Sequence, residues 1–268
     1  MIKLNIGELI FYPLLVGSML LLVATGYVEI RNGLRNGQKN LVVLGIAYIL
    51  TVSYLILLAF TTRWVLINLN LTIIYFLIFY FVIQTFYIKS KVLFRFMLAV
   101  MIISACIMNF LAFAIHGVGI YEISTLIRFI DILSMNLLSF TAFLSCAILA
   151  YKNYEIFRKE NIEPWIYVRL KIIAVSSGII AFLNVPEFVR LNPDVSAADP
   201  NDPISLFVFF IQSTMMILFA CGQFVAWIMP VKLKEYCREK YEYLPHRQHE
   251  GELTEEEVLK QLRGGTDE

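Results

Sequence analysis

Residues 120–152 read IYEISTLIRFIDILSMNLLSFTAFLSCAILAYK, and this stretch decides the fold class of the chain. A helix needs about 20 apolar residues to cross a bilayer, and this stretch supplies them. Besides Glu122 and Lys152 near its ends, the stretch contains two charged residues, Arg128 and Asp131. A charge at the bilayer centre costs at least roughly 2.5–3.5 kcal/mol, so we expect both side chains to face protein or water instead of lipid.

The polar side chains of this stretch gather on one face of the predicted helix. At about 100° per residue, one stripe carries most of them, with Asn136 at its edge. The members of this stripe are Tyr121, Thr125, Arg128, Asp131, Ser139 and Cys146. The pattern predicts a helix whose polar stripe is covered by other membrane spans.

The rest of the chain supplies those spans. Of its 268 residues, 59% are hydrophobic and 16% charged, and the mean hydropathy is +0.72. Soluble domains are nearer 45–50% apolar and about 25% charged. Six further apolar segments are predicted at 9–30, 41–60, 64–88, 93–115, 172–189 and 204–229. We therefore predict an all-α membrane protein in which residues 1–230 form a bundle of seven transmembrane helices, a multi-pass protein of the plasma membrane.

Lysine and arginine gather in every second joint between these spans. The joints at 29–40, 88–96, 152–171 and 231–249 hold sixteen basic residues, and the joints on the other side hold four. Basic loops stay on the cytoplasmic side of a membrane. The bias predicts an N-terminus outside and a C-terminus in the cytoplasm.

Two short regions follow the last span. Residues 231–249 form a basic juxtamembrane segment, which favours an anionic inner leaflet. Its Cys237 is expected to be a free thiol, with acylation as the alternative. Residues 250–268 form an acidic tail, in which Thr254 and Glu257 have the spacing of a capping box. The predicted tail helix is too short to be stable alone, so we expect it to dock on a cytoplasmic protein partner. The docking face would be Val258, Leu259 and Leu262.

Motifs for catalysis and cofactor binding are missing from the sequence. It contains no G-x-x-x-x-G-K-[ST], G-x-G-x-x-G, H-E-x-x-H or G-x-S-x-G. Only one histidine, His116, lies near the spans, which argues against a haem or metal centre. We expect a protein that is not an enzyme and has no cofactor, no metal site and no nucleic-acid partner.

Rhodopsins and G-protein-coupled receptors also have seven spans with the N-terminus outside. Residues 204–229 lack the Schiff-base lysine of a retinal protein, and the receptor motifs D-R-Y and N-P-x-x-Y are missing. The likeness is therefore one of topology alone, and it assigns no family.

Polar residues in and near the spans predict a ligand site. The candidates to line an outward-facing cavity for a small polar or charged ligand are Tyr121, Glu122, Arg128, Asp131, Asn136, Asn184, Glu187, Arg190, Gln212 and Gln223. Arg128 and Asp131 are three residues apart, as are Glu187 and Arg190, so each couple can pair on a helix. We expect Asp131 to pair with Arg128 or Arg190. The alternative is that these pairs serve helix packing alone.

These features favour a sensor or receptor-like bundle that signals to a separate cytoplasmic partner. The alternatives are a small-solute or ion transporter or channel, and a structural or assembly subunit of a membrane complex. Transporters often contain broken helices or internal repeats. Here Pro13 and Pro186 lie near span ends and no repeat is evident, which favours the sensor. Homo-oligomer formation stays open.

Overall fold

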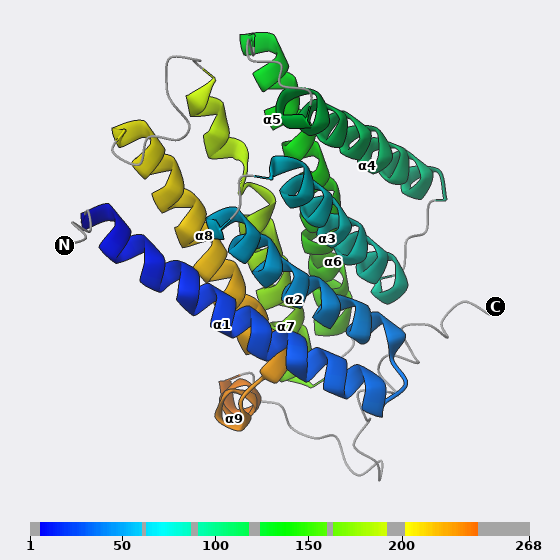
Figure 1. The fold of residues 1–268 in the computed structure, drawn as a ribbon. Helices are drawn as coiled ribbons and strands as arrows, with labels where there is room; N and C mark the ends of the chain where they lie inside the picture. Colours follow the sequence, from blue (N-terminus) through cyan, green and yellow to red (C-terminus); the bar gives the residue numbers. More distant parts are fainter. Residues whose placement is uncertain are drawn as a thin grey trace.

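The computed structural model describes residues 6–60, 63–86, 91–117, 124–159, 163–191 and 202–240, and every regular element in these ranges is a helix (Figure 1). The α-helices are α1 (Ile6–Arg35), α2 (Lys39–Phe60), α3 (Trp64–Thr85), α4 (Lys91–Ala112), α5 (Thr125–Ser139), α6 (Ser145–Lys159), α7 (Pro164–Ala181), α8 (Pro203–Ile228) and α9 (Val231–Lys240). Three shorter elements are the π-helices η1 (Phe113–Gly117) and η2 (Phe140–Leu144) and the 3-10 helix η3 (Val185–Arg190).

Seven helical stretches in the described ranges are long and apolar enough to cross a membrane. Helices α1 to α4 and α8 supply one each. The fifth stretch consists of α5, η2 and α6, and the sixth consists of α7 and η3. The predicted all-helical architecture with seven such helices is confirmed.

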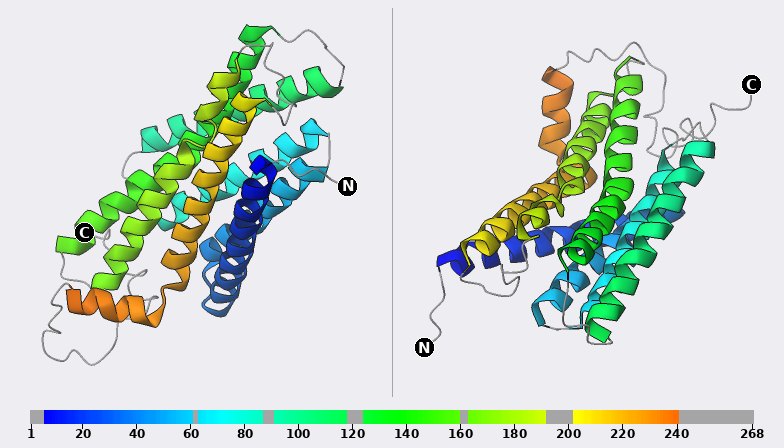
Figure 2. Two further views of the ribbon diagram at one scale, coloured as in Figure 1. Left: turned by 90° about the vertical axis from the view of Figure 1, so that its left-hand side faces the viewer. Right: turned by 90° about the horizontal axis from the view of Figure 1, so that it is seen from above.

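The seven stretches pack so that the first and the last are neighbours. Helix α1 contacts both α2 and α8, and α8 also contacts α7 (Figures 1 and 2). Helix α3 lies toward the middle, where Tyr75, Phe79 and Phe81 are each 2% exposed. By contrast, Phe96 and Phe110 of α4 are mostly exposed, as a lipid-facing side would require.

Two glycines set the close contact between α1 and α2. A Cβ atom on Gly26 would lie 2.8 Å from the carbonyl oxygen of Gly45, and a Cβ on Gly45 would lie 2.6 Å from that of Gly26. No side chain fits at either distance. Small residues allow this backbone approach, which is a common way to pack helices in membranes.

The sixth span differs from its predicted bounds, 172–189. The helix begins at Pro164, because Arg169 and Lys171 are accommodated within it. The Arg169 guanidinium lies 4.3 Å from the centre of the Trp227 ring, and the Lys171 amine lies 5.8 Å from that of Tyr154. Aromatic faces attract cations, so charged residues extend the helix beyond the purely apolar run.

The fifth span, predicted at 120–152, is described from Ser124 onward and continues to Lys159. Ser124 caps α5 by accepting a hydrogen bond from the backbone N–H of Ile127 at 3.3 Å. The stretch is not a uniform α-helix, because η2 interrupts it with a π turn. Such π segments often occur at functional positions in helices.

The predicted polar stripe on this span faces the protein over most of its length. Asn136, Ser139 and Cys146 are buried, and Arg128 and Asp131 are half-buried. Thr125 is exposed, so the expectation is wrong at that end of the stripe. Tyr121 lies outside the described residues.

Helix α8 has defined ends. Asp202 caps its start by accepting a hydrogen bond from the backbone N–H of Ser205 at 2.9 Å. Met229 ends it in a left-handed conformation with φ of 36°, and Pro230 follows. From there α9 runs across the end of the bundle (Figure 2). The predicted basic juxtamembrane segment is therefore helical over its first ten residues.

Candidate functional site

The sixth span is broken near the end at which α8 begins. Helix α7 ends at Ala181, three residues form a turn, and the chain continues as the 3-10 helix η3, which contains Pro186. The sequence predicts an unbroken span here. Proline cannot donate a backbone hydrogen bond, and the turn releases carbonyl groups that an intact helix would have used. At membrane depth such groups must find partners in the protein.

Polar side chains from neighbouring helices supply those partners. Each donates a hydrogen bond to a backbone carbonyl at or beside the break. The donor and acceptor pairs are Ser139 Oγ to Ala181 at 3.0 Å, Gln212 Nε2 to Leu183 at 3.3 Å, and Asn136 Nδ2 to Asn184 at 3.3 Å. The break is thus held by α5 and α8, which explains why these two apolar helices carry the buried Asn136 and the half-buried Gln212.

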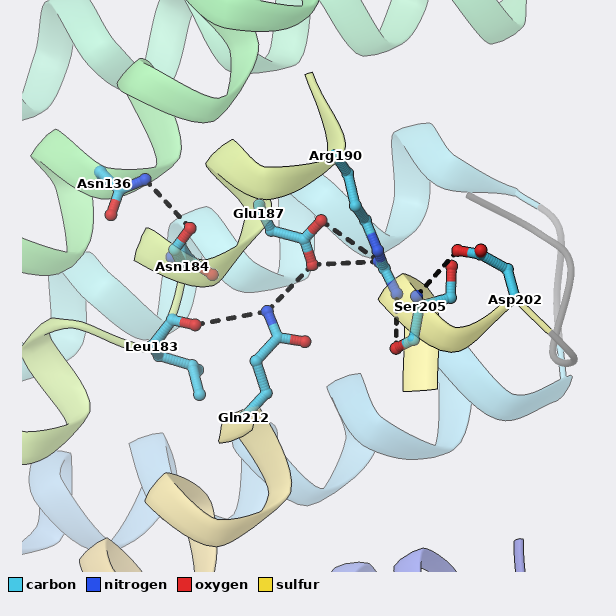
Figure 3. Close-up of polar contacts among 8 residues, drawn as sticks. All are labelled: Asn136, Leu183, Asn184, Glu187, Arg190, Asp202, Ser205 and Gln212. Carbon is cyan, nitrogen blue, oxygen red and sulfur yellow. Dashed lines mark hydrogen bonds and ion pairs between the residues drawn. The ribbon is translucent and has the colours of Figure 1, made fainter. Parts of the chain in front are cut away.

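An ion pair lies beside the break (Figure 3). Arg190 donates from Nη1 to both carboxylate oxygens of Glu187, at 3.2 and 3.3 Å, and from Nη2 to the carbonyl of Ser205 at 3.0 Å. Gln212 Nε2 donates to Glu187 Oε1 at 2.9 Å. Arg190 is only 5% exposed. The predicted pairing of Glu187 with Arg190 is confirmed, and it joins η3 to α8.

We call this cluster, which lies at the end of α8 away from α9, the outer network. Its members are Asn136, Asn184, Glu187, Arg190, Ser205 and Gln212. Asn184 extends it to α3 by donating to the Tyr75 hydroxyl at 3.3 Å.

The outer network contains buried polar atoms that have no hydrogen-bond partner among the described residues. They are Arg190 Nε, Asn136 Oδ1 and Ser205 Oγ. The three residues are at most 5% exposed. A buried polar atom without a partner costs about 1–3 kcal/mol, so in native proteins such atoms are paired with water, an ion or a ligand.

Contrary to the expectation from the sequence, Asp131 does not belong to the outer network. Arg190 uses its guanidinium on Glu187 and Ser205, so the predicted pairing of Arg190 with Asp131 is wrong. Arg128 acts electrostatically on Asp131, but no ion pair joins the two among the described residues. Asp131 Oδ1 is a further buried atom without a partner there.

A second polar cluster surrounds Gln223, nearer the other end of α8. Gln223 Oε1 accepts hydrogen bonds from the Tyr48 hydroxyl at 2.8 Å and Trp227 Nε1 at 2.9 Å. Its Nε2 donates to the hydroxyls of Ser176 at 2.8 Å and Ser177 at 3.4 Å. We call these five residues the inner hub. Both lone pairs and both N–H groups of the amide are used, although Gln223 is only 2% exposed.

The inner hub adjoins a small cavity and a buried acid. The cavity has a volume of about 10 Å³, close to the room needed for one water molecule, and its lining includes Tyr48, Phe143 and Cys146. Glu29 of α1 is 1% exposed and interacts electrostatically with Tyr48. An ionisable residue inside a membrane span is expensive and commonly functional.

Sequence reasoning missed several of these residues for identifiable reasons. Glu29 adjoins the predicted end of the first span and Arg31, where charge is expected. Tyr48 and Tyr75 lie in apolar runs and count as apolar themselves. The adjacent pair Ser176-Ser177, within an otherwise apolar run, is a signal that could have pointed to the inner hub, and the sequence reasoning did not use it.

The remaining predicted site residues are placed as follows. Tyr121 and Glu122 lie outside the described residues, as do Val258, Leu259 and Leu262 of the predicted tail helix. Gln223 belongs to the inner hub and not to the outer network. In the described part of the chain, no group of three His, Cys, Asp or Glu side chains is arranged to hold a metal ion.

No protein-family model, curated protein or solved structure matches the chain.

Proposed function

We propose that the chain is an integral membrane protein of the plasma membrane, with its N-terminus outside and its C-terminus in the cytoplasm. In this proposal it is a receptor-like sensor, not an enzyme, that binds a small polar ligand at the outer network. One observation carries the proposal. Among the residues that the structure describes, Arg190 Nε, Asn136 Oδ1 and Ser205 Oγ of the outer network have no partner, whereas the amide of Gln223 in the inner hub is fully bonded.

The unpaired atoms indicate the kind of ligand. Arg190 Nε is a donor, Asn136 Oδ1 is an acceptor, and the Ser205 hydroxyl is both. The charge of Arg190 is already offset by Glu187. A neutral or zwitterionic molecule with both donor and acceptor groups therefore suits the network better than a strong anion does.

Helix α7 is the element through which we expect the signal to pass. Its broken end is bonded to the outer network through the carbonyls of Leu183 and Asn184. Ser176 in its middle belongs to the inner hub. At its start, Glu163 pairs with Arg238 of α9 at 2.9 Å. A ligand that rearranged the break would thus act on an element that also holds the cytoplasmic helix.

A transporter is the second candidate, and the break itself favours it. Many transporters bind their substrates where spanning helices are discontinuous. The same ligand site would then open to each side in turn. The two functions differ in whether the ligand crosses the membrane.

Thermal unfolding of the full-length protein in nanodiscs, with a panel of amino acids as zwitterionic probes, tests the ligand site. We expect at least one amino acid to raise the Tm of the wild type, and Ser205→Ala to lose this effect. Because the Ser205 hydroxyl has no partner in the described ranges of the chain, its removal should leave the unliganded Tm nearly unchanged. The matched control is Thr214→Ala, which lies on the exposed side of α8 and should keep the effect.

Proteoliposomes then separate the two functions. Uptake of the same radiolabelled amino acid would favour the transporter, and binding without uptake would favour the sensor. Wild-type protein whose Tm does not respond to any member of the panel would contradict the proposed ligand class.

The membrane orientation has its own test. In a variant without its native cysteines, Asn36→Cys and Glu155→Cys should not react with an impermeant maleimide added to intact cells. Arg63→Cys, in the joint on the opposite side, should react. Labelling at position 36 or 155 would overturn the orientation.

A further inference from the structure

We propose that α9 binds the headgroups of anionic phospholipids through an exposed stripe of Lys232, Tyr236 and Lys240. The proposal rests on the membrane placement and orientation proposed above, and it does not depend on the ligand of the outer network.

One side of α9 packs against α7 and holds the helix there. Cys237 is 2% exposed and packs with Trp165 and Met229. Burial raises the pKa of the Cys237 thiol, which makes acylation there unfavourable. The Lys234 amine lies 4.1 Å from the centre of the Trp165 ring.

A salt bridge completes this attachment. Arg238 Nη2 lies 2.9 Å from Glu163 Oε1, at the residue that precedes α7. The left-handed Met229 and the following Pro230 fix the turn out of α8. The position of α9 across the end of the bundle is therefore set by the fold before any lipid binds (Figure 2).

The exposed stripe lies on a different flank of α9. Lys232, Tyr236 and Lys240 are spaced four residues apart, which places them in one row along the helix. All three are exposed, Tyr236 by 54%, and the Lys240 amine lies 5.6 Å from the centre of the Tyr236 ring. A tyrosine between lysines suits the bilayer interface, where the ring sits at headgroup level and lysine stems extend their charges to phosphates.

The end of the bundle on which α9 lies carries further exposed positive charge. Helices α1, α2, α4 and α6 carry exposed basic residues at the ends that the alternating direction of the spans places on the same side of the bundle as α9. These are Arg31, Arg35, Lys39, Lys91, Arg95, Lys152, Arg158 and Lys159. Basic residues next to a span are attracted to the anionic cytoplasmic leaflet. We choose lipid over an acidic protein as the occupant because α9 leaves a spanning helix directly and lies across its end.

Hydrogen exchange of the full-length protein in nanodiscs tests the proposal. One set of discs contains phosphatidylcholine alone, and the other contains about 30 mol% phosphatidylserine in addition. We expect the amides of 231–240 to exchange about fivefold more slowly with phosphatidylserine, and the difference to vanish at about 0.5 M NaCl.

Variants that change the charge of α9 test whether the exposed stripe causes the slower exchange with phosphatidylserine. Lys232→Gln combined with Lys240→Gln should remove the lipid dependence, while Lys234 and Arg238 still hold α9 on α7. Glu239→Gln, an exposed acid on the same helix, should increase it. Arg63→Gln, at the opposite end of the bundle, should leave it unchanged.

Equal exchange of α9 in the two sets of wild-type discs would overturn the proposal, and the stripe would then be assigned to a protein contact. Lipid dependence that survives in the double variant would also contradict it. Failure of the amino-acid panel to bind would leave this result untouched, because the two experiments probe opposite ends of the bundle.

Discussion

The outer network and the inner hub share α8 but have opposite character. They are centred on Gln212 and Gln223, which at 1.5 Å per residue lie about 16 Å apart along the helix. The outer network contains an ion pair and the carbonyls of a broken helix, and three of its buried atoms have no partner in the part of the chain that the structure describes. The inner hub is built on a neutral amide whose four hydrogen-bonding positions are filled.

This difference separates two roles of polar residues inside the spans, which are helix packing and ligand binding. A fully bonded amide joins helices α2, α7 and α8 and leaves nothing for a ligand to add. A network with spare donors and acceptors is less stable alone, and a ligand that pairs them has a ready source of binding energy. Besides the ion pair, the completeness of hydrogen bonding within the described part of the chain distinguishes the two regions.

The largest expected effect concerns the ion pair of the outer network. Arg190→Gln should lower the free energy of unfolding by about 3 kcal/mol, because it leaves the Glu187 carboxylate without its cation. The double change Glu187→Gln with Arg190→Gln should recover part of this loss. Unfolding titrations of the four proteins of this cycle in mixed micelles would measure it. Strictly additive single effects would mean that the two charges are not coupled.

Substitution in the inner hub should lower the free energy of unfolding nearly as much, but it should not affect ligand binding. Gln223→Leu removes four hydrogen bonds, and at about 0.6 kcal/mol each the loss is about 2 kcal/mol. Gln212→Leu removes two and should cost about half as much, and it should also weaken the Tm response to amino acids. If Gln223→Leu abolished that response while the protein stayed folded, the separation of the two regions would be wrong.

Alanine substitutions at one glycine of α7 and one of α8 should have smaller effects on stability, and the two can be compared directly. A Cβ atom on Gly222 would lie 2.5 Å from the Cβ of Ser176, so Gly222→Ala should destabilise the contact at the inner hub by about 1 kcal/mol after the gain in helix propensity. Gly178→Ala is the matched control, because its Cβ would meet Ala147 at 3.9 Å, an ordinary contact. It should be neutral or stabilising by up to about 1 kcal/mol. Equal Tm shifts for the two variants would contradict the tight packing of the hub.

The smallest expected effect is at the link between the outer network and α3. Tyr75→Phe removes the hydroxyl that accepts from Asn184 and should cost about 0.6 kcal/mol. Tyr80→Phe, on the same helix but 48% exposed, is the control and should change little. The same unfolding titration resolves this pair when both are compared with wild type. An effect of Tyr75→Phe no greater than that of Tyr80→Phe would exclude α3 from the network.

Part of the candidate site was predictable because its geometry is local. The pairing of Glu187 with Arg190 follows from a spacing of three residues, which places two side chains on the same side of one helical turn. The partner of Asp131 was not predictable in this way. Whether Arg190 turns toward Asp131 or Glu187 depends on where η3 lies relative to α5 and α8.

The sequence by itself determined that the chain is helical and that seven stretches are apolar enough to cross a membrane. Length and hydropathy are properties of consecutive residues, so no knowledge of neighbouring helices is needed to count them. Only the tertiary structure decided that the sixth span breaks after Ala181, that Gln223 bonds to Tyr48, and that α9 folds back onto Trp165. Each of these depends on which side chains from distant segments meet, because a released carbonyl or a buried amide is stable only where a partner from another helix reaches it.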